Sequence, residues 1–553
     1  MTIDELQKTL ANAIKGDVTS NTGDRTKASR DTSLFTRMPE LVAYPKDQDD
    51  VRTLVATVAH AKADGMPISL AARAAGTDMS GGPLTTGVVI SFTKYMNHMG
   101  EVGDGHAVTE PGVYYRDFEK ATLKEGLILP SYPASRELAA MGGIVANNSG
   151  GERTLEYGKT ERYVEELEVV LADGSGATFG ALSRSELEEK KKLDTTEGRI
   201  YREMDALLAE NAELIEAHRP QVSKNSAGYA LWSVRDKATG VFNLAKLICG
   251  SQGTLALWTK AKLALVAPKP RRAMLVIFLS DLDVLPEIVR RVLPHTPESF
   301  ESYDDHTFSL AIKFLPEMLG QMGFFRAVRL GLSFIPEVFM AATGGVPKMI
   351  LMAEFSADTL DEADRRAREA KQALADLNVR SKIERDEKAS EKFWIVRRES
   401  FALLRKNLHG MYASPFIDDF VVPPESYPEF LPKLNALLAE YSSHFIYTIA
   451  GHIGNGNFHI IPLMDLSKPE SRQVILDLAP KVYELVIQEG GTTTGEHNDG
   501  IIRTPYLPML FGDEMMALFA KTKMIFDPEN ILNPGKKVGG TFDDIKRDMI
   551  TSI

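Results

Sequence analysis

Three glycine-rich segments in the first half of the chain constrain its fold most strongly. They are RAAGTDMSGG at 73–82, GGIVANNSGG at 142–151 and GSQGT at 250–254, and the first directly follows an apolar run typical of a strand. Glycine lets backbone N–H groups converge in a tight turn, which is one way that proteins bind a nucleotide pyrophosphate. None of the three matches the GxGxxG or GxxxxGK[ST] fingerprints, so nicotinamide dinucleotides and nucleoside triphosphates are disfavoured.

At 553 residues the chain exceeds the length that one hydrophobic core supports, so we expect several domains. After Pro268 the strand-like AMLVIFLSD precedes the helical LDVLPEIVRRVL, and MILMAEFSA precedes TLDEADRRAREAKQALADL. A repeated strand–helix unit indicates an α+β layer. The predicted parts are an N-terminal helical arm (1–38), a cofactor-binding domain (39–270), a cap or substrate domain (271–500) and a C-terminal return to the first domain (501–553).

Charge and cysteine content narrow the class of protein. A net charge of -12 argues against nucleic acid as a partner, because phosphate binding needs a basic surface. The single cysteine, Cys249, excludes an intramolecular disulfide and a cysteine-bound iron–sulfur cluster. The N-terminus shows no apolar signal-peptide core, so we expect a cytoplasmic protein. The apolar, Met- and Phe-rich segment 308–349 is either a helical hairpin of the cap domain, which we favour, or a peripheral contact with the inner membrane face.

Two histidines flank a glycine-rich turn in GHIGNGNFHI. His452 follows the strand-like FIYTIA and His459 lies in the strand-like FHIIPL, so folding back at the turn would bring both imidazoles together. In GEHNDG, Glu496 and His497 are adjacent and flanked by glycines. Two histidines and one carboxylate with an open position form a recurring catalytic site for zinc or manganese. The alternative is a pair of polar residues that flank an ordinary hairpin.

An arginine lies on an apolar helical stripe in EKFWIVRRESFALLRKNLHG. On a helical wheel, Arg397 falls near the centre of the stripe formed by Phe393, Trp394, Phe401, Leu404 and Leu408. A guanidinium there is costly unless it is paired. Its partner is either an internal Asp or Glu or the carboxylate of a substrate, which a guanidinium binds through two parallel hydrogen bonds. Arg398, at the edge of the stripe, is the fallback for the second role.

The order of these motifs carries a family resemblance. AARAAGTDMSGG, PASRELAAMGGIVANNSGGERTLEYG, GSQGTL, GHIGNGNFH, GEHNDG and FDPENILNPGK follow one another between about Leu41 and Val538. This stretch resembles the vanillyl-alcohol-oxidase-like flavoprotein superfamily, and within it the FAD-linked D-2-hydroxy acid dehydrogenases, a branch with D-lactate dehydrogenase, glycolate oxidase and D-2-hydroxyglutarate dehydrogenase. The resemblance implies an α+β fold, with a two-subdomain FAD-binding domain and an α+β cap domain that carries the substrate site.

The resemblance also implies how FAD is bound. Members that attach the flavin covalently have a histidine in the first glycine-rich loop, where this chain has Thr77, so we expect non-covalent FAD. The expected FAD contacts are Arg73, Ala74, Ala75, Gly76, Thr77, Asp78, Ser80, Gly81, Pro133, Gly142, Gly143, Asn147, Ser149, Gly150, Gly250, Gly253, Thr254 and Asn533.

The same resemblance implies the chemistry: metal ligands at His452, His459 and Glu496, a catalytic base at His497, and Arg397 on the substrate carboxylate. We therefore predict transfer of a hydride from C2 of a D-2-hydroxy acid to flavin N5. D-lactate is the first substrate, and D-2-hydroxyglutarate or glycolate are alternatives. An alternative of another class is a non-catalytic flavin-binding electron-transfer subunit. With no iron–sulfur motif in the chain, the electron acceptor must be a quinone, a cytochrome, an electron-transfer flavoprotein or oxygen, and no oligomeric state is predicted.

Overall fold

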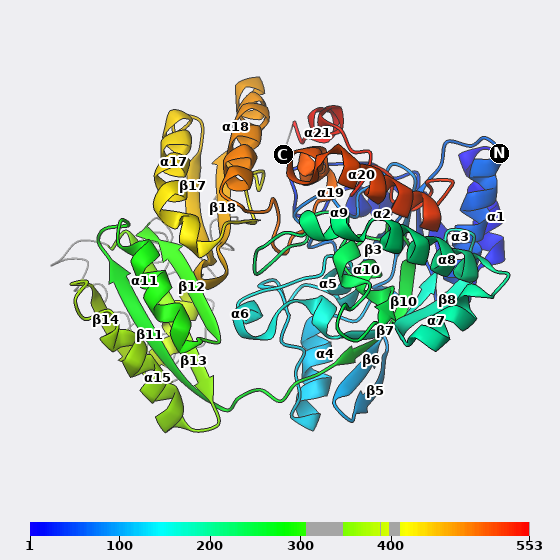
Figure 1. The fold of residues 1–553 in the computed structure, drawn as a ribbon. Helices are drawn as coiled ribbons and strands as arrows, with labels where there is room; N and C mark the ends of the chain where they lie inside the picture. The colour runs from blue at the N-terminus through cyan, green and yellow to red at the C-terminus, as the bar shows by residue number, and fades with distance from the viewer. Residues whose placement is uncertain (306–346, 387–388, 398–409, 552–553) are drawn as a thin grey trace, which may run out of the picture.

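The computed structural model describes residues 1–305, 347–386, 389–397 and 410–551. Figure 1 shows two parts side by side, joined by an extended connection between residues 264 and 271. The segment 308–349, predicted as a hairpin or a membrane contact, falls almost wholly outside the described residues. Within the described part, no helix is long and apolar enough to cross a membrane.

The first layer is a four-stranded sheet near the N-terminus. In spatial order its strands are β1 (Asp17–Thr19), β2 (Leu41–Tyr44), β4 (Val88–Ser91) and β3 (Leu70–Arg73). The helices of this region are α1 (Ile3–Ala13), α2 (Thr22–Ala28) and α3 (Gln48–Ala63). Leu6 and Leu10 of α1 share one apolar core with α3, and β1 pairs with β2. The predicted arm 1–38 therefore contributes a helix and an edge strand to this layer.

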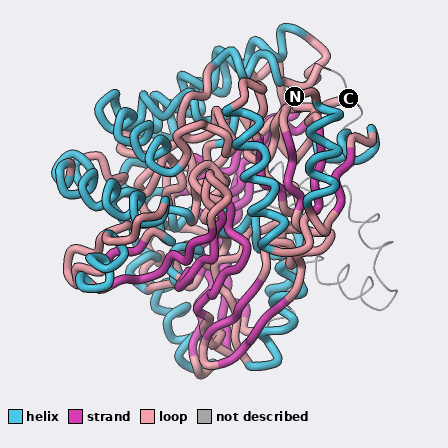
Figure 2. Tube along the Cα trace, turned by 90° about the vertical axis from the view of Figure 1, so that its right-hand side faces the viewer, coloured by secondary structure: helices cyan, strands magenta, loops and turns pink. Residues whose placement is uncertain are grey.

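The second layer is a six-stranded antiparallel sheet. Its strands are β5 (Met99–Gly103), β6 (His106–Thr109), β10 (Leu257–Ala264), β7 (Val164–Val170), β8 (Gly176–Leu182) and β9 (Phe242–Asn243). Its helices are α4 (Tyr115–Thr122), α5 (Met141–Ala146), α6 (Thr154–Tyr157), α7 (Arg184–Lys191), α8 (Thr196–Glu210), α9 (Ala212–Ala217) and α10 (Ala245–Ile248). Figure 2 shows strands in the interior and helices around them, so the sheets form the centre of the molecule.

The cap is built on an eight-stranded antiparallel sheet. Its strands are β14 (Arg380–Glu384), β11 (Arg271–Leu279), β13 (Met349–Ala357), β12 (Ser299–Asp304), β17 (Ile446–His452), β18 (Asn457–Met464) and β15 (Tyr412–Ala413), with β16 (Phe420–Val421) beside β18. Its helices are α11 (Leu285–Val292), α15 (Leu360–Gln372), α17 (Tyr427–Glu440) and α18 (Pro469–Gln488). The strand–helix repeat predicted from the sequence is present as β11–α11 and β13–α15.

Both faces of the cap sheet are covered, because alternate residues of a strand point to opposite faces. Leu275 and Ile277 of β11 belong to the core that α11 and α15 complete. Val276, between them, packs on the other face with Phe393 and Val396, which lie in a helical stretch at 389–397. This packing positions the described helical residues 389–397, which include Arg397. Because both faces of β11 are covered, its sequence is an unbroken apolar run.

The C-terminal segment returns to the first two layers. It contains α19 (Gly500–Arg503), α20 (Leu507–Phe526) and α21 (Phe542–Asp548). Phe511 and Phe519 of α20 lie in the core of the six-stranded sheet. Beyond α20, Leu532 forms a parallel bridge with Leu70 of β3. These contacts place the C-terminal segment against the first two layers, and segregated sheets with covering helices confirm the predicted α+β class.

Candidate active site

A cavity of about 530 Å³ brings the two halves of the predicted site together. One part of its wall comes from the glycine-rich segments at 73–82, 142–151 and 250–254. Another part is formed by the five residues predicted to carry the chemistry: Arg397, His452, His459, Glu496 and His497. Residues up to 465 positions apart in the sequence thus face one cavity.

Polar side chains hold the glycine-rich loops against one another. Asp78 accepts hydrogen bonds from the backbone N–H of Gly82 at 2.8 Å and from the Asn147 amide at 2.8 Å. Gly76 has a φ of +73°, in the region that favours glycine. A Cβ at Gly142 would lie 2.9 Å from the Cβ of Ala74, so the close approach of the first two loops requires a glycine there. The loops therefore leave backbone groups, rather than side chains, toward the cavity.

Thirteen of the expected FAD contacts line this cavity. They are Arg73, Ala74, Ala75, Gly76, Thr77, Asp78, Pro133, Gly142, Gly143, Asn147, Ser149, Gly150 and Gly253. Five others do not line it: Ser80, Gly81, Gly250, Thr254 and Asn533. Asn533, for example, donates to the carbonyl oxygens of Gly82 at 2.9 Å and Gln252 at 2.8 Å. These five lie behind the cavity wall and hold its loops in place, because turn motifs contain supporting residues as well as exposed ones.

Thr32 and Gln252 are two of the lining residues that the sequence analysis did not predict. Thr32, in the predicted N-terminal arm, donates from its hydroxyl to the carbonyl oxygens of Thr77 at 3.0 Å and Asp78 at 2.8 Å. Gln252 lies inside the third glycine-rich segment and donates to the hydroxyl of Ser80 at 3.2 Å. Nothing in the local sequence marks Thr32, whereas the position of Gln252 between two glycines did offer a signal.

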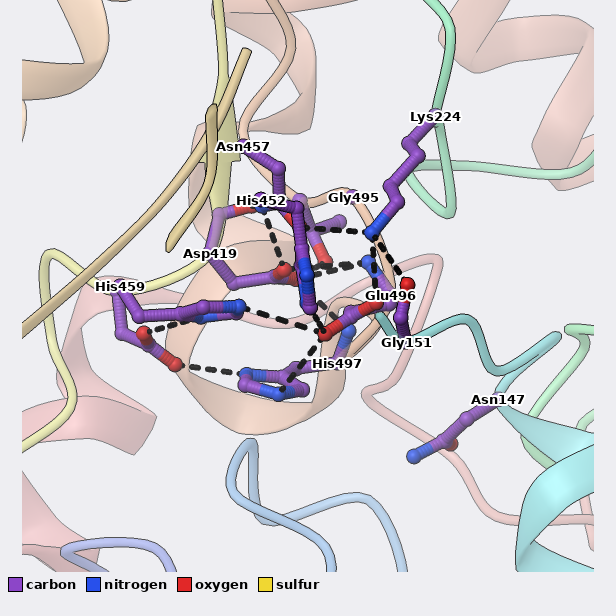
Figure 3. Close-up of polar contacts among 12 residues, drawn as sticks. Asn147, Gly151, Lys224, Asp419, His452, Asn457, His459, Gly495, Glu496 and His497 are labelled. Atoms are coloured by element: carbon purple, nitrogen blue, oxygen red, sulfur yellow. Dashed lines mark hydrogen bonds and ion pairs between the residues drawn. The ribbon is translucent and has the colours of Figure 1, made fainter. Parts of the chain in front are cut away.

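Three imidazoles surround one carboxylate oxygen, as Figure 3 shows. The Nε2 atoms of His452, His459 and His497 lie 3.1, 3.4 and 3.9 Å from Oε1 of Glu496. The first two histidines come from the β17–β18 hairpin, in which His459 is paired with Ala450 and His452 with Asn457. The fold-back predicted from the glycine-rich turn is therefore confirmed, and the hairpin brings both rings to the same carboxylate.

The other ring nitrogen of each histidine also contacts a carboxylate. Nδ1 of His452 lies 2.6 Å from Glu301, and Asp418 lies 3.0 Å from Nδ1 of His459 and 2.7 Å from Nδ1 of His497. Histidines that bind a metal commonly donate their second N–H to a carboxylate, which fixes the ring and its tautomer. With one nitrogen of each ring fixed in this way, the Nε2 atoms and Glu496 form a donor set that fits a divalent cation.

Asp419 lies within reach of the same centre but is fully engaged by hydrogen bonds. Its ligand atom and those of His459, Glu496 and His497 all lie within 4.8 Å of one another. However, its carboxylate accepts from the Thr494 hydroxyl at 2.5 Å and from the backbone N–H groups of Glu496 at 3.0 Å and His497 at 2.7 Å. Asp419 is also absent from the cavity wall, whereas His452 is part of it. We therefore keep His452, rather than Asp419, in the candidate ligand set.

Electrostatics in this cluster favour an ionised Glu496 and, in the absence of a metal, a charged His459. Burial alone would raise the pKa of Glu496, but the positive charge of Lys224 and the contact with His452 hold that pKa well below its usual range. Burial alone would lower the pKa of His459, but Asp418 and Glu496 outweigh burial and raise the pKa to about 10. Glu496 is thus a buried, ionised carboxylate that can bind a cation.

Arg397 has an internal acidic partner and also lines the cavity, where a substrate carboxylate would bind. Its side chain is buried and lines the cavity, and its Nη2 lies 3.3 Å from Oε2 of Glu301. Within the described part of the chain, its buried Nε has no hydrogen-bond partner. The guanidinium is therefore paired with an internal acid, and its Nε donor is unused among the described residues. Arg398, the fallback, lies outside the described residues.

Three further residues of the cluster were missed: Glu301, Asp418 and Lys224. Asp418 belongs to the pair of acids in FIDDFVVP, and two acids within an apolar run are a signal that could have been used. Glu301 lies on β12, where the sequence around it is polar, and Lys224 lies in a loop. Neither has a local signal, because their partners are 151 and 272 residues away.

The loop at 491–499 carries Glu496 and His497 and contacts both parts of the molecule. On the cap side, Thr492 exchanges backbone hydrogen bonds with Val421 at 3.0 and 2.9 Å. On the other side, the carbonyl oxygen of Gly495 accepts a hydrogen bond from Lys159 Nζ at 2.7 Å. Two elements of the fold therefore fix the candidate ligand and the candidate base.

Comparison with known families fits this arrangement. Residues 39–180 match the profile of the FAD binding domain, and residues 268–537 match that of the C-terminal domain of FAD linked oxidases. The chain belongs to the FAD-linked oxidases. In this FAD-linked oxidase, the first two glycine-rich segments fall within the FAD-binding profile, and the histidine cluster falls within the C-terminal one. The family predicted from the order of motifs is thereby confirmed.

Individual relatives of this FAD-linked oxidase differ in substrate. D-2-hydroxyglutarate dehydrogenase of Pseudomonas putida is 28% identical over 530 residues, which are 94% of this chain and 50% of that protein. D-lactate dehydrogenase of Archaeoglobus fulgidus is 28% identical over 508 residues, 90% of this chain and 91% of that protein. The chain thus spans about half the length of the first relative. The 4-ethylphenol oxidase of Gulosibacter chungangensis has a TM-score of 0.68 at 16% identity, with 98% of each chain covered, and confirms the vanillyl-alcohol-oxidase type of fold.

Proposed function

We propose that this chain is a FAD-dependent dehydrogenase that oxidises a D-2-hydroxy acid to the 2-oxo acid with the help of a divalent metal. The observation that carries the proposal is the shared cavity, because the predicted FAD loops and the histidine–carboxylate cluster line the same space. FAD is bound non-covalently, and zinc or manganese is bound by His452, His459 and Glu496. Electrons leave to an external quinone, cytochrome or electron-transfer flavoprotein.

The residues that line the cavity have different roles, which follow from their positions. When bound, FAD supplies the hydride acceptor and a divalent metal supplies a Lewis acid for the hydroxyl oxygen. His497 is the most exposed of the four cluster residues, at 23% against 11% or less for the others, and its Nε2 accepts the hydroxyl proton. Its partner Asp418 stabilises the resulting imidazolium. Arg397 binds the carboxylate and orients C2 of the substrate.

D-lactate is the first substrate to test, because the charges described in the cavity suit one carboxylate. Among the described residues that line it, the only lysines or arginines are Arg73 and Arg397. Arg73 donates to the carbonyl oxygen of Arg30 at 2.7 Å and lies in the first glycine-rich segment. Arg397 is thus the one described cation available next to the histidine cluster. D-2-hydroxyglutarate is the second candidate, and the Pseudomonas putida relative supports it.

Anaerobic flavin reduction tests this proposal. The FAD- and manganese-loaded protein is mixed with D-lactate, D-2-hydroxyglutarate, glycolate or L-lactate, and the visible flavin absorbance is followed. We expect bleaching by D-lactate and none by L-lactate. Faster bleaching by D-2-hydroxyglutarate would select the second candidate. A flavin that none of these compounds bleaches would instead indicate a non-catalytic flavin-binding subunit. Full-rate bleaching after exhaustive chelation would remove the metal from the mechanism.

A further inference from the structure

Asp418 connects two histidines for which we propose different roles. It lies just before β16, and its carboxylate is completely buried. Oδ1 lies 3.0 Å from Nδ1 of His459 and Oδ2 lies 2.7 Å from Nδ1 of His497. The two rings stack, with centroids 5.1 Å apart and planes inclined by 30°. One carboxylate therefore bridges a candidate metal ligand and the candidate base.

Arg503 fixes the position of this carboxylate. Its guanidinium is completely buried and donates to the backbone carbonyl oxygen of Asp418 at 2.7 Å and to that of Asn498 at 2.9 Å. Asn498 follows His497 in the sequence, so the same arginine ties the Asp418 segment to the loop that carries the base. Arg503 thus connects the backbone at Asp418 to the backbone of the loop that carries His497.

The proton positions follow from the chemistry of the groups. An ionised carboxylate only accepts hydrogen bonds, so both Nδ1 atoms must carry a proton. In the neutral form of each ring, the lone pair then lies on Nε2, the atom that faces Glu496 at 3.4 Å in His459 and 3.9 Å in His497. His452 is independent of this arrangement, because its Nδ1 contacts Glu301 instead.

We propose, resting on the function proposed above, that Asp418 is a shared positioning residue. It fixes His459 and His497 in the same tautomer, so that one ring presents its Nε2 lone pair to the metal and the other presents it to the hydroxyl proton of the substrate. Metal binding and proton acceptance then depend on a single carboxylate that touches neither the metal nor the substrate.

Asp418→Asn tests the shared role in the FAD-loaded protein. An amide accepts through one terminal atom and donates through the other, so it cannot hold both rings in this tautomer. We expect manganese affinity to fall by about 10–100-fold, as for other carboxylates behind metal-binding histidines. At saturating manganese and D-lactate, we also expect flavin reduction to slow by roughly 10²-fold or more, because His497 is then no longer held in the tautomer that leaves its Nε2 free to accept a proton. Asp418→Glu keeps an ionised acceptor and should restore part of both properties.

Asp527→Asn is the matched control. Asp527 is also a completely buried carboxylate, but it pairs with Lys523 at 2.6 Å and lies away from the cavity wall. We expect this variant to melt at a lower temperature, with manganese affinity and flavin reduction rate within about twofold of the unaltered protein. If Asp418→Asn changes neither property, changes only one, or changes both no more than Asp527→Asn does, the shared role is wrong.

A measurement on the unaltered protein separates this inference from the function on which it rests. The function is judged by flavin reduction with and without manganese. The tautomers are judged by 15N spectra of histidine-labelled, FAD- and zinc-loaded protein, with signals assigned from single-histidine variants. We expect a protonated Nδ1 in both His459 and His497. A bare Nδ1 in either ring overturns the inference, whatever the activity, and this test holds even if the Asp418 variants do not fold.

Discussion

Lys224→Met separates the charge of Glu496 from its role as a ligand. Nζ of Lys224 lies 3.1 Å from Oε2 of Glu496, on the side away from the three imidazoles, and the two side chains are 0% and 4% exposed. Methionine keeps most of the lysine volume and removes its charge. Breaking a buried ion pair costs about 3–5 kcal/mol, because the remaining charge is uncompensated. Glu496 keeps its contacts with His452 and His459. We therefore expect Lys224→Met to lower the free energy of unfolding of the metal-free protein by about 3 kcal/mol, at the low end of this range.

A bound divalent cation should offset most of this loss. It supplies positive charge to Glu496, and the repulsion between Lys224 and the cation is absent in the variant. We expect a destabilisation of about 1 kcal/mol in the metal-loaded protein. The difference of about 2 kcal/mol corresponds to roughly 30-fold tighter metal binding. This sign is opposite to that expected for loss of a ligand, which weakens metal binding.

Calorimetric manganese titration and thermal unfolding of the FAD-loaded protein measure both effects. The matched control is Lys537→Met, since Nζ of Lys537 lies 2.9 Å from Asp499 and both side chains are completely buried. Lys537→Met should lower the melting temperature by the same amount with and without manganese. The reasoning is refuted if Lys224→Met binds manganese more weakly than the unaltered protein, or if manganese does not reduce its destabilisation below that of Lys537→Met.

Further variants assign the remaining roles. Alanine at any of the three candidate metal ligands should remove the metal and most activity but keep the flavin, as checked by metal analysis beside visible spectra, because an open site with three protein ligands has none to spare. His497→Ala should keep flavin and metal but slow anaerobic flavin reduction by on the order of 10²-fold or more; an unchanged rate would remove it as the base. Arg397→Ala should mainly raise KM, and Arg397→Lys should restore it incompletely because an ammonium group cannot copy the bidentate contact. Acid precipitation should release FAD into the supernatant, and flavin retained in the pellet would contradict non-covalent binding.

Local patterns predicted the elements that depend on neighbouring residues. The unbroken apolar runs around Leu275 and Leu351 predicted strands, and the glycine-rich turn before His459 predicted the hairpin that brings two imidazoles together. The helical wheel also identified Arg397 as a buried charge. Each of these depends on the spacing of side chains within one element, and a sequence displays that spacing directly.

Long-range pairing accounts for what the sequence did not predict. Glu301 and Asp418 acquire their roles only when β12 and the segment before β16 meet the histidines, and no local spacing encodes that meeting. For Asn533 the family resemblance implied contact with FAD, whereas in the structure its amide donates to the carbonyl oxygens of Gly82 and Gln252 and the residue does not line the cavity. The helical wheel could not identify which group pairs with Arg397, because that group, Glu301, lies on β12 and not on the helix.

The loop at 491–499 limits where this protein can be recombined with others. An exchange of the cap sheet, from β11 to β18 (271–464), would bring in new equivalents of His452 and His459 but keep the Glu496 of the host. The loop would then have to pair with an unfamiliar strand at Val421 while Lys159 still holds it on the other side. A functional chimaera therefore needs compatible residues at both contacts.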